Sequence, residues 1–92
     1  MRQKKLRKAV ALILKRSKEQ GEKGLTVGQI RDRLMNEGYK NTPSGRKLGQ
    51  ILRSTDGFLM KDRIVFYDKD LQGSVQLHLW TIDWLEVQTW MA

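Results

Sequence analysis

The chain has 92 residues and no cysteine, so neither a disulfide framework nor a thiolate metal site supports its fold. A chain of this length is expected to form a single domain with a modest core. Its formal net charge of +8 and pI of about 10.1 are strongly basic for its size. The first 14 residues are too charged for a secretory signal, and no apolar run is long enough for a membrane span.

The positive charge is concentrated in the first two thirds of the chain. Residues 1–63 contain 17 Lys and Arg and 6 Asp and Glu. Residues 64–92 contain only 1 Lys or Arg and 4 Asp and Glu. This excess of cations favours a polyanionic partner. Nucleic acid is the commonest such partner, and an anionic membrane surface and acidic proteins are the alternatives.

A long basic helix is predicted over residues 2–20, with residues 1–5 as a flexible basic end. One side is an apolar stripe at helical spacing, which is typical of a buried face. The other side is rich in lysines, which either are solvated or contact the phosphates of a nucleic acid. Gly21 and Gly24 are expected to end the helix. The stripe comprises Leu6, Val10, Ile13 and Leu14, and the candidate phosphate contacts are Lys4, Lys8 and Lys15.

A second helix is predicted to begin after Thr26. Thr26 and Gln29 form a capping-box pattern, in which each side chain accepts a hydrogen bond from the other residue's backbone N–H. Gly38 can supply the left-handed turn that ends the helix, and residues 38–41 would then form the corner to the next helix. The apolar seam of this helix is Val27, Ile30 and Leu34.

A third helix is predicted over residues 43–53. Thr42 would cap it, and Pro43 suits its first position, because proline has no backbone N–H to leave unpaired. One face carries apolar residues at the spacing of a buried stripe. The opposite face carries residue types that read base edges and phosphates, although such a face can also be simply solvated. The buried stripe is Leu48, Ile51, Leu52 and Thr55, and the exposed stripe is Arg46, Gln50 and Arg53, flanked by Lys47 and Ser54.

Two strands of a hairpin are predicted over residues 64–67 and 74–80. These segments are rich in β-branched and aromatic residues, and apolar and polar residues alternate in the second. The connection, residues 68–73, is polar and ends in glycine, as many longer hairpin loops do. His78 is the single histidine and has no carboxylate near it in sequence, so a metal site is not expected.

The last segment, residues 81–92, is a C-terminal extension that either forms a short helix or continues as irregular chain. Asp83 and Glu86 give it a start that resembles a capping box. Three tryptophans close together either fill the core or form an apolar surface for a partner. We predict that Trp84 and Trp90 form such a surface and that it supports a homodimer.

The order of three helices followed by a hairpin resembles the winged helix-turn-helix family of DNA-binding domains. The resemblance covers roughly residues 6–82 and implies an α+β fold in which helix 43–53 enters the major groove and residues 68–73 form the wing. Many wings in the family are basic, whereas this one carries Asp68 and Asp70 around a single lysine. We therefore expect the wing to stand off the DNA.

We expect a non-catalytic protein that binds double-stranded DNA, without a cofactor, metal or small-molecule substrate. It would serve as a small transcriptional regulator or a replication or plasmid-type factor, in the cytoplasm or nucleoid. No acidic pair in the sequence has a base, nucleophile or metal companion, so catalysis is not expected. The alternatives are a winged domain that docks a protein through its Trp-rich last third, and a non-specific nucleic-acid or RNA binder. The predicted DNA-binding residues are Arg46, Lys47, Gln50, Arg53, Ser44, Thr42, Lys40 and Arg31.

Overall fold

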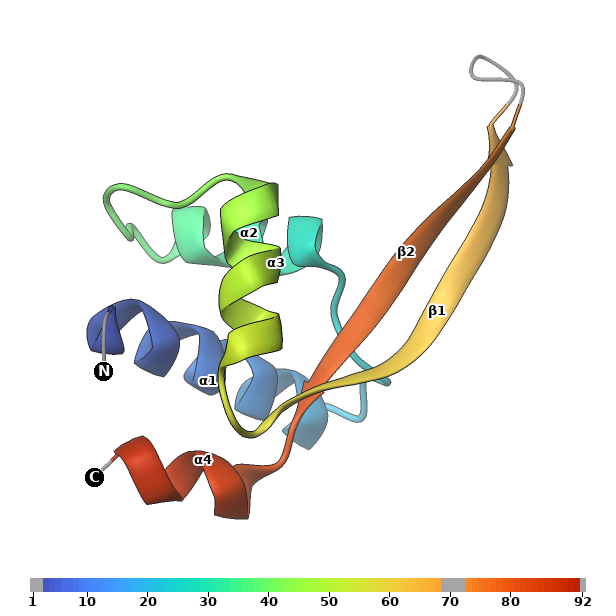
Figure 1. The fold of residues 1–92 in the computed structure, drawn as a ribbon. Helices are drawn as coiled ribbons and strands as arrows, with labels where there is room; N and C mark the ends of the chain where they lie inside the picture. Colours follow the sequence, from blue (N-terminus) through green and yellow to red (C-terminus); the bar gives the residue numbers. More distant parts are fainter. Residues whose placement is uncertain (1–2, 69–72, 92) are drawn as a thin grey trace.

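The computed structural model describes residues 3–68 and 73–91, and it describes side chains over residues 3–63 and 77–91. Four helices and a two-stranded antiparallel hairpin make up the regular structure of these residues, which confirms the predicted α+β class. Figure 1 shows the hairpin projecting away from the packed helices. No helix in the described part is long and apolar enough to cross a membrane. The elements are α1 (Lys4–Glu19), α2 (Val27–Asn36), α3 (Gly45–Ser54), β1 (Phe58–Asp68), β2 (Gly73–Ile82) and α4 (Trp84–Met91).

Helix α1 buries its apolar stripe as predicted, but it is shorter at both ends than the predicted 2–20. Gln3 precedes it in a left-handed conformation with φ of 57°. Gly21 follows it with φ of 80°, and the N–H of Glu22 bonds the carbonyl of Ser17 at 3.1 Å. This pattern is a Schellman motif, which satisfies the last carbonyls of the helix. The stripe residues Leu6, Val10, Ile13 and Leu14 are at most 5% exposed.

Helix α2 has both of its predicted end motifs. The N–H of Thr26 donates to Oε1 of Gln29 at 2.9 Å, and the N–H of Gln29 donates to Oγ1 of Thr26 at 3.2 Å. The capping box is therefore confirmed. At the other end Gly38 has φ of 77°, and the N–H of Tyr39 bonds the carbonyl of Leu34 at 3.0 Å. These end motifs fix where α2 begins and where the chain leaves it.

The corner between α2 and α3 is longer than predicted. It spans residues 37–44 rather than 38–41. Asn41 adopts φ of 59°, a left-handed conformation that asparagine tolerates better than most residues. The hydroxyl of Thr42 donates to the carbonyl of Tyr39 at 2.9 Å. The corner is thus an ordered loop with its own hydrogen bonds.

Helix α3 begins later than predicted, because the predicted cap residue is used elsewhere. Thr42 belongs to the corner and Pro43 is not helical. Ser44 is the cap, and its Oγ accepts the N–H of Lys47 at 3.3 Å. The carbonyl of Pro43 accepts a bond from Nε of Arg31 at 3.0 Å, so the neighbouring helix holds the residue just before the cap. This contact between distant residues overrides the local preference of proline for the first helical position.

The hairpin is confirmed, and both strands are longer than predicted. Phe58 pairs with Ile82, so the apolar segment that leads into the predicted first strand is already part of β1. A bulge between Met60 and Asp62 shifts the register. A bulge increases the local twist and bends the strand, which helps the hairpin leave the helical body.

The predicted wing loop lies almost entirely outside the described residues. Asp68 pairs with Gly73, and this pair closes the described ladder. Residues 69–72 are not described, and neither is the side chain of Asp68. The predictions on Asp68 and Asp70 therefore stay predictions.

A backbone bridge ties the hairpin to the start of α2. The N–H of Leu25 bonds the carbonyl of Trp80 at 2.9 Å, and the N–H of Trp80 bonds the carbonyl of Leu25 at 2.7 Å. Both Leu79 and Trp80 are buried, because this end of β2 packs against α1 and α2. Leu77 is 40% exposed instead. The alternation of apolar and polar residues in β2 therefore does not mark a single buried face.

The last segment was predicted to be either a short helix or irregular chain. It forms helix α4 over Trp84–Met91. Oδ1 of Asp83 accepts the N–H of Glu86 at 3.4 Å, and Val87 is fully buried. Trp84 and Trp90 pack against the core as partly buried side chains. This packing agrees with a core-filling role for the tryptophans, and the homodimer stays a prediction.

Candidate nucleic-acid interface

Helix α3 has one buried and one exposed face, and the exposed face carries the residues predicted to read DNA. Leu48 and Leu52 are fully buried, and Ile51 is 5% exposed. Residues on the opposite side of the helix are exposed, and α3 stands at the front of the molecule in Figure 1. We call the exposed set the α3 stripe: it consists of Arg46, Lys47, Gln50 and Arg53.

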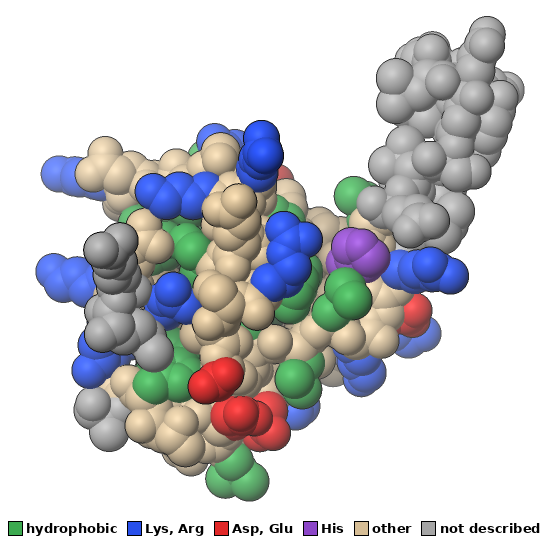
Figure 2. Space-filling view, viewed as in Figure 1, with side chains coloured by type: hydrophobic (Ala, Val, Ile, Leu, Met, Phe, Trp, Pro, Cys, Tyr) green, Lys and Arg blue, Asp and Glu red, His purple; other side chains and the backbone are tan. Residues whose placement is uncertain are grey.

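The cations of the α3 stripe have no intramolecular partner among the described residues, in contrast with several cations of α1 and α2. Arg16 of α1 forms an ion pair with Glu37, and Arg33 of α2 lies 3.1 Å from a carboxylate oxygen of Glu22. Figure 2 shows Lys and Arg side chains on both sides of α3. Because their charge is not neutralised by neighbours, the stripe is a region of positive potential.

Lys15, one of the predicted phosphate contacts, is engaged by α4. Its Nζ lies 4.2 Å from the centroid of the Trp84 ring and 3.8 Å from Oε1 of Glu19. A cation over an aromatic ring at an exposed site contributes about 0.5–1 kcal/mol. Of the other two predicted contacts, Lys4 is exposed and Lys8 is half-buried. A phosphate would have to compete with Trp84 for Lys15, but not for Lys8.

Three further predicted DNA-binding residues hold the corner and α3 in place. The guanidinium of Arg31 bonds the carbonyl of Pro43, Ser44 caps α3, and the hydroxyl of Thr42 bonds within the corner. The two hydroxyls and Nε of Arg31 are thus engaged inside the protein, where they position the corner and the start of α3.

A second basic surface lies where the start of α1 meets the corner. A hollow of about 310 Å³ is lined by Lys5, Lys40 and Lys47, together with Tyr39 and Pro43. The structure therefore brings Lys40, predicted as a DNA contact, next to Lys47 of the stripe. Sequence reasoning missed Lys5, although it belongs to the basic run at the start of the chain. This hollow extends the positive surface from α3 toward the N-terminus of α1.

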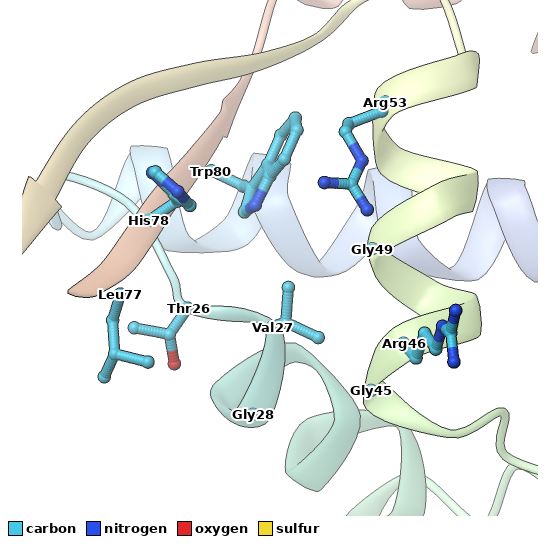
Figure 3. Close-up of a pocket in the computed structure, with 10 residues that line it drawn as sticks. All are labelled: Thr26, Val27, Gly28, Gly45, Arg46, Gly49, Arg53, Leu77, His78 and Trp80. Carbon is cyan, nitrogen blue, oxygen red and sulfur yellow. The ribbon is translucent and has the colours of Figure 1, made fainter. Parts of the chain in front are cut away.

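A groove of about 320 Å³ runs beside α3, between this helix, the start of α2 and the inner part of β2. Figure 3 shows Arg53 pointing from α3 toward Trp80, with Leu77 and His78 on the side of β2. The Cβ that Gly49 lacks would lie 3.6 Å from Nη2 of Arg53, so the guanidinium folds back over the helix. Arg53 is therefore positioned at the groove rather than extended straight into solvent.

The lining of this groove combines positive charge with apolar surface. Arg53 supplies the charge, whereas the guanidinium of Arg46 points away from the groove in Figure 3. No acidic side chain of the described residues lines the groove. Val27, Leu77 and Trp80 supply the apolar part. Sequence reasoning missed the contribution of β2, because only the bridge between the hairpin and the start of α2 brings it there.

The order of α2, corner, α3 and hairpin is compatible with a winged-helix layout. Comparisons of the chain with protein-family models, with curated proteins and with solved structures found no match. Function is therefore inferred from the residues and surfaces of the chain itself.

Proposed function

We propose that the chain is a non-catalytic winged-helix protein that binds double-stranded DNA, with α3 as its recognition helix. The observation that carries the proposal is the α3 stripe, in which three cations and a glutamine are exposed on a helix whose other face is buried. None of these cations has a partner within the described residues. Three unneutralised cations and a glutamine on one helical face can bind the phosphates and base edges of DNA.

The stripe divides into base-reading and phosphate-binding residues. By resemblance to winged domains, the N-terminal half of α3 would lie deepest in the major groove, which makes Arg46 and Gln50 the base readers. Arginine bonds guanine bidentately and glutamine bonds adenine, and each such pair contributes about 1–3 kcal/mol of discrimination. Lys47 and Arg53 would bind phosphates, which supply affinity without sequence preference.

The basic hollow at the start of α1 would add phosphate contacts on one flank of α3. Lys5 and Lys40 lie there beside Lys47. With these contacts the protein would act as a small transcriptional regulator or as a replication or plasmid-type factor, in the cytoplasm or nucleoid. The rival hypothesis of a protein-docking domain has less support, because Trp84 and Trp90 are engaged with the core of the chain.

A binding titration at two salt concentrations tests this proposal. A mixed-sequence DNA duplex should bind and lose affinity steeply as salt rises, since each phosphate contact adds about 0.9 to the slope of log K against log salt. Single-stranded RNA of the same length serves as the comparison. Equal affinity for RNA would favour a non-specific nucleic-acid binder, and no affinity for either would leave only the protein-docking alternative.

A further inference from the structure

The groove beside α3 meets a second hollow on the hairpin at His78. We call the part of the hairpin that lines this hollow, residues 60–63 and His78, the stem, and it carries further cations. His78 lines both this groove and a neighbouring hollow of about 310 Å³ that also contains Arg63. Arg63 and His78 are opposite each other in the strand register, and opposite residues project to the same side of a hairpin. Figure 2 shows the histidine between Lys and Arg side chains on the side of α3 and on the side of the stem.

The charges along this path are mostly positive. Arg53 points into the groove from α3, and Lys61 and Arg63 line the neighbouring hollow on the stem. The single acidic side chain lining the neighbouring hollow is Asp62, whose Oδ1 accepts the backbone N–H of Arg63. That bond leaves the negative charge of Asp62 in place. Lys61 and Arg63 line the same hollow, so cations outnumber acids along the path among the described lining residues.

The shape of the groove restricts what can fill it. Gly45 and Gly49 leave the α3 wall without side chains at two positions one turn apart, and Val27 and Leu77 make the opposite surfaces apolar. A ligand that fits must be narrow, place apolar atoms against these surfaces and bring negative charge to Arg53, which points toward Trp80 in Figure 3. A DNA strand has this chemistry, because its deoxyribose rings carry apolar C–H groups and each nucleotide carries one phosphate.

We propose that this groove seats the sugar–phosphate backbone of one DNA strand, so that the stem of the hairpin, rather than its acidic tip, makes the second contact with the duplex. The inference rests on the proposed function and specifies which part of the DNA lies where. Arg53 holds phosphates from the side of α3, Arg63 holds them from the stem, and the apolar surfaces contact the sugars.

A charge-neutral steric block is the first test. A Cβ at Gly45 would lie 3.7 Å from Cγ1 of Val27, which is an ordinary contact, so a side chain there projects into the groove without straining the fold. Gly45→Gln should weaken binding to every duplex about tenfold, because the strand is displaced. Gly45→Ala should stay within about threefold of the wild type, since one methyl group leaves most of the groove open. Thermal unfolding of both variants checks that the fold is kept.

Removal of a stem cation is the second test and does not depend on filling the groove. Arg63→Gln should lower the salt slope of DNA binding by about one unit. Lys23→Gln is the matched control, because Lys23 is an exposed cation in the loop before α2, outside the groove. It should leave the salt slope unchanged.

The results separate this inference from the proposed function. If Gly45→Gln and Arg63→Gln both bind like Lys23→Gln while variants of the α3 stripe lose affinity, the stem does not touch DNA and only this inference falls. If the wild-type protein does not bind duplex DNA, the proposed function falls and this inference falls with it. If an acidic peptide displaces duplex DNA from the wild type but not from Arg63→Gln, the groove accepts extended anionic chains in general, which overturns its assignment to DNA.

Discussion

The cations of α3 and those of α1 and α2 have different surroundings. On α1, Arg16 is paired with Glu37, and Lys15 lies over the ring of Trp84; on α2, Arg33 is paired with Glu22. On α3 the cations of the α3 stripe have no partner within the described part of the chain. The same residue types therefore hold parts of the chain together on α1 and α2 and remain available for a ligand on α3.

The largest effect on stability is expected where α4 docks on the body of the protein. Gly57 has φ of 93°, and a Cβ there would lie 2.5 Å from Cγ2 of Val87. Gly57→Ala should reduce the free energy of unfolding by about 2–4 kcal/mol, because backbone strain and overpacking add. Urea unfolding measures this loss.

The matched control for this change is Gly21→Ala. Gly21 also has a positive φ, 80°, but no atom lies within 4 Å of its missing Cβ. Gly21→Ala should reduce the free energy of unfolding by only about 1–2 kcal/mol, because it adds backbone strain without overpacking. Equal losses for the two variants would mean that Val87 does not press on Gly57 and that α4 is not tightly docked.

The next largest effect is expected on DNA affinity, when the proposed phosphate contacts of the α3 stripe are removed. Lys47→Ala and Arg53→Ala should each weaken binding to all duplexes alike and lower the salt slope by about one unit, since each removes one phosphate contact. Fluorescence titrations at several salt concentrations give the slope. A change confined to one sequence would instead assign that residue to base reading.

A smaller effect is expected from the ion pair between Arg33 of α2 and Glu22 of the loop after α1. The side chains of Arg33 and Glu22 are 37% and 35% exposed, and surface pairs of this kind contribute about 0–1 kcal/mol. Arg33→Ala should reduce the free energy of unfolding by less than about 1 kcal/mol. Its effect on DNA affinity should disappear at higher salt, because it would arise only from long-range charge. A salt-resistant loss of affinity would show that an internally paired cation also contacts the DNA.

The smallest effect on DNA affinity is predicted for the tip of the hairpin, which is the predicted wing loop at residues 68–73. If the tip stands off the DNA, replacing both Asp68 and Asp70 with Asn should change the free energy of binding by less than about 0.5 kcal/mol once salt removes the long-range term. A large gain that persists at high salt would place the tip against the duplex. This pair of substitutions thus complements the test of the stem.

Local patterns in the sequence predicted the helices well. The capping box of Thr26 and Gln29 and the turn at Gly38 depend on residues within one helix and its end, and both are present. The buried and exposed faces of α3 follow from helical spacing in the same way. Such features need no information about the rest of the molecule.

Features that depend on distant contacts were not predictable in this way. The start of α3 was misplaced because the bond from Arg31 to Pro43 spans the corner. The burial of both Leu79 and Trp80, and the groove beside α3, depend on the bridge between Leu25 and β2. A period-two pattern cannot anticipate a strand end that packs on more than one side.

The most direct test of the central claim compares two double variants on two DNA duplexes. Arg46→Ala with Gln50→Ala removes the proposed base readers, and Lys23→Ala with Gln88→Ala removes one cation and one glutamine from exposed positions outside α3. Binding to a selected site and to its scrambled sequence is measured at two salt concentrations. The first double variant should lose about 2–6 kcal/mol of discrimination between the duplexes, while the second keeps it. If the first double variant discriminates as well as the wild type at both salt concentrations, α3 is not the helix that reads DNA.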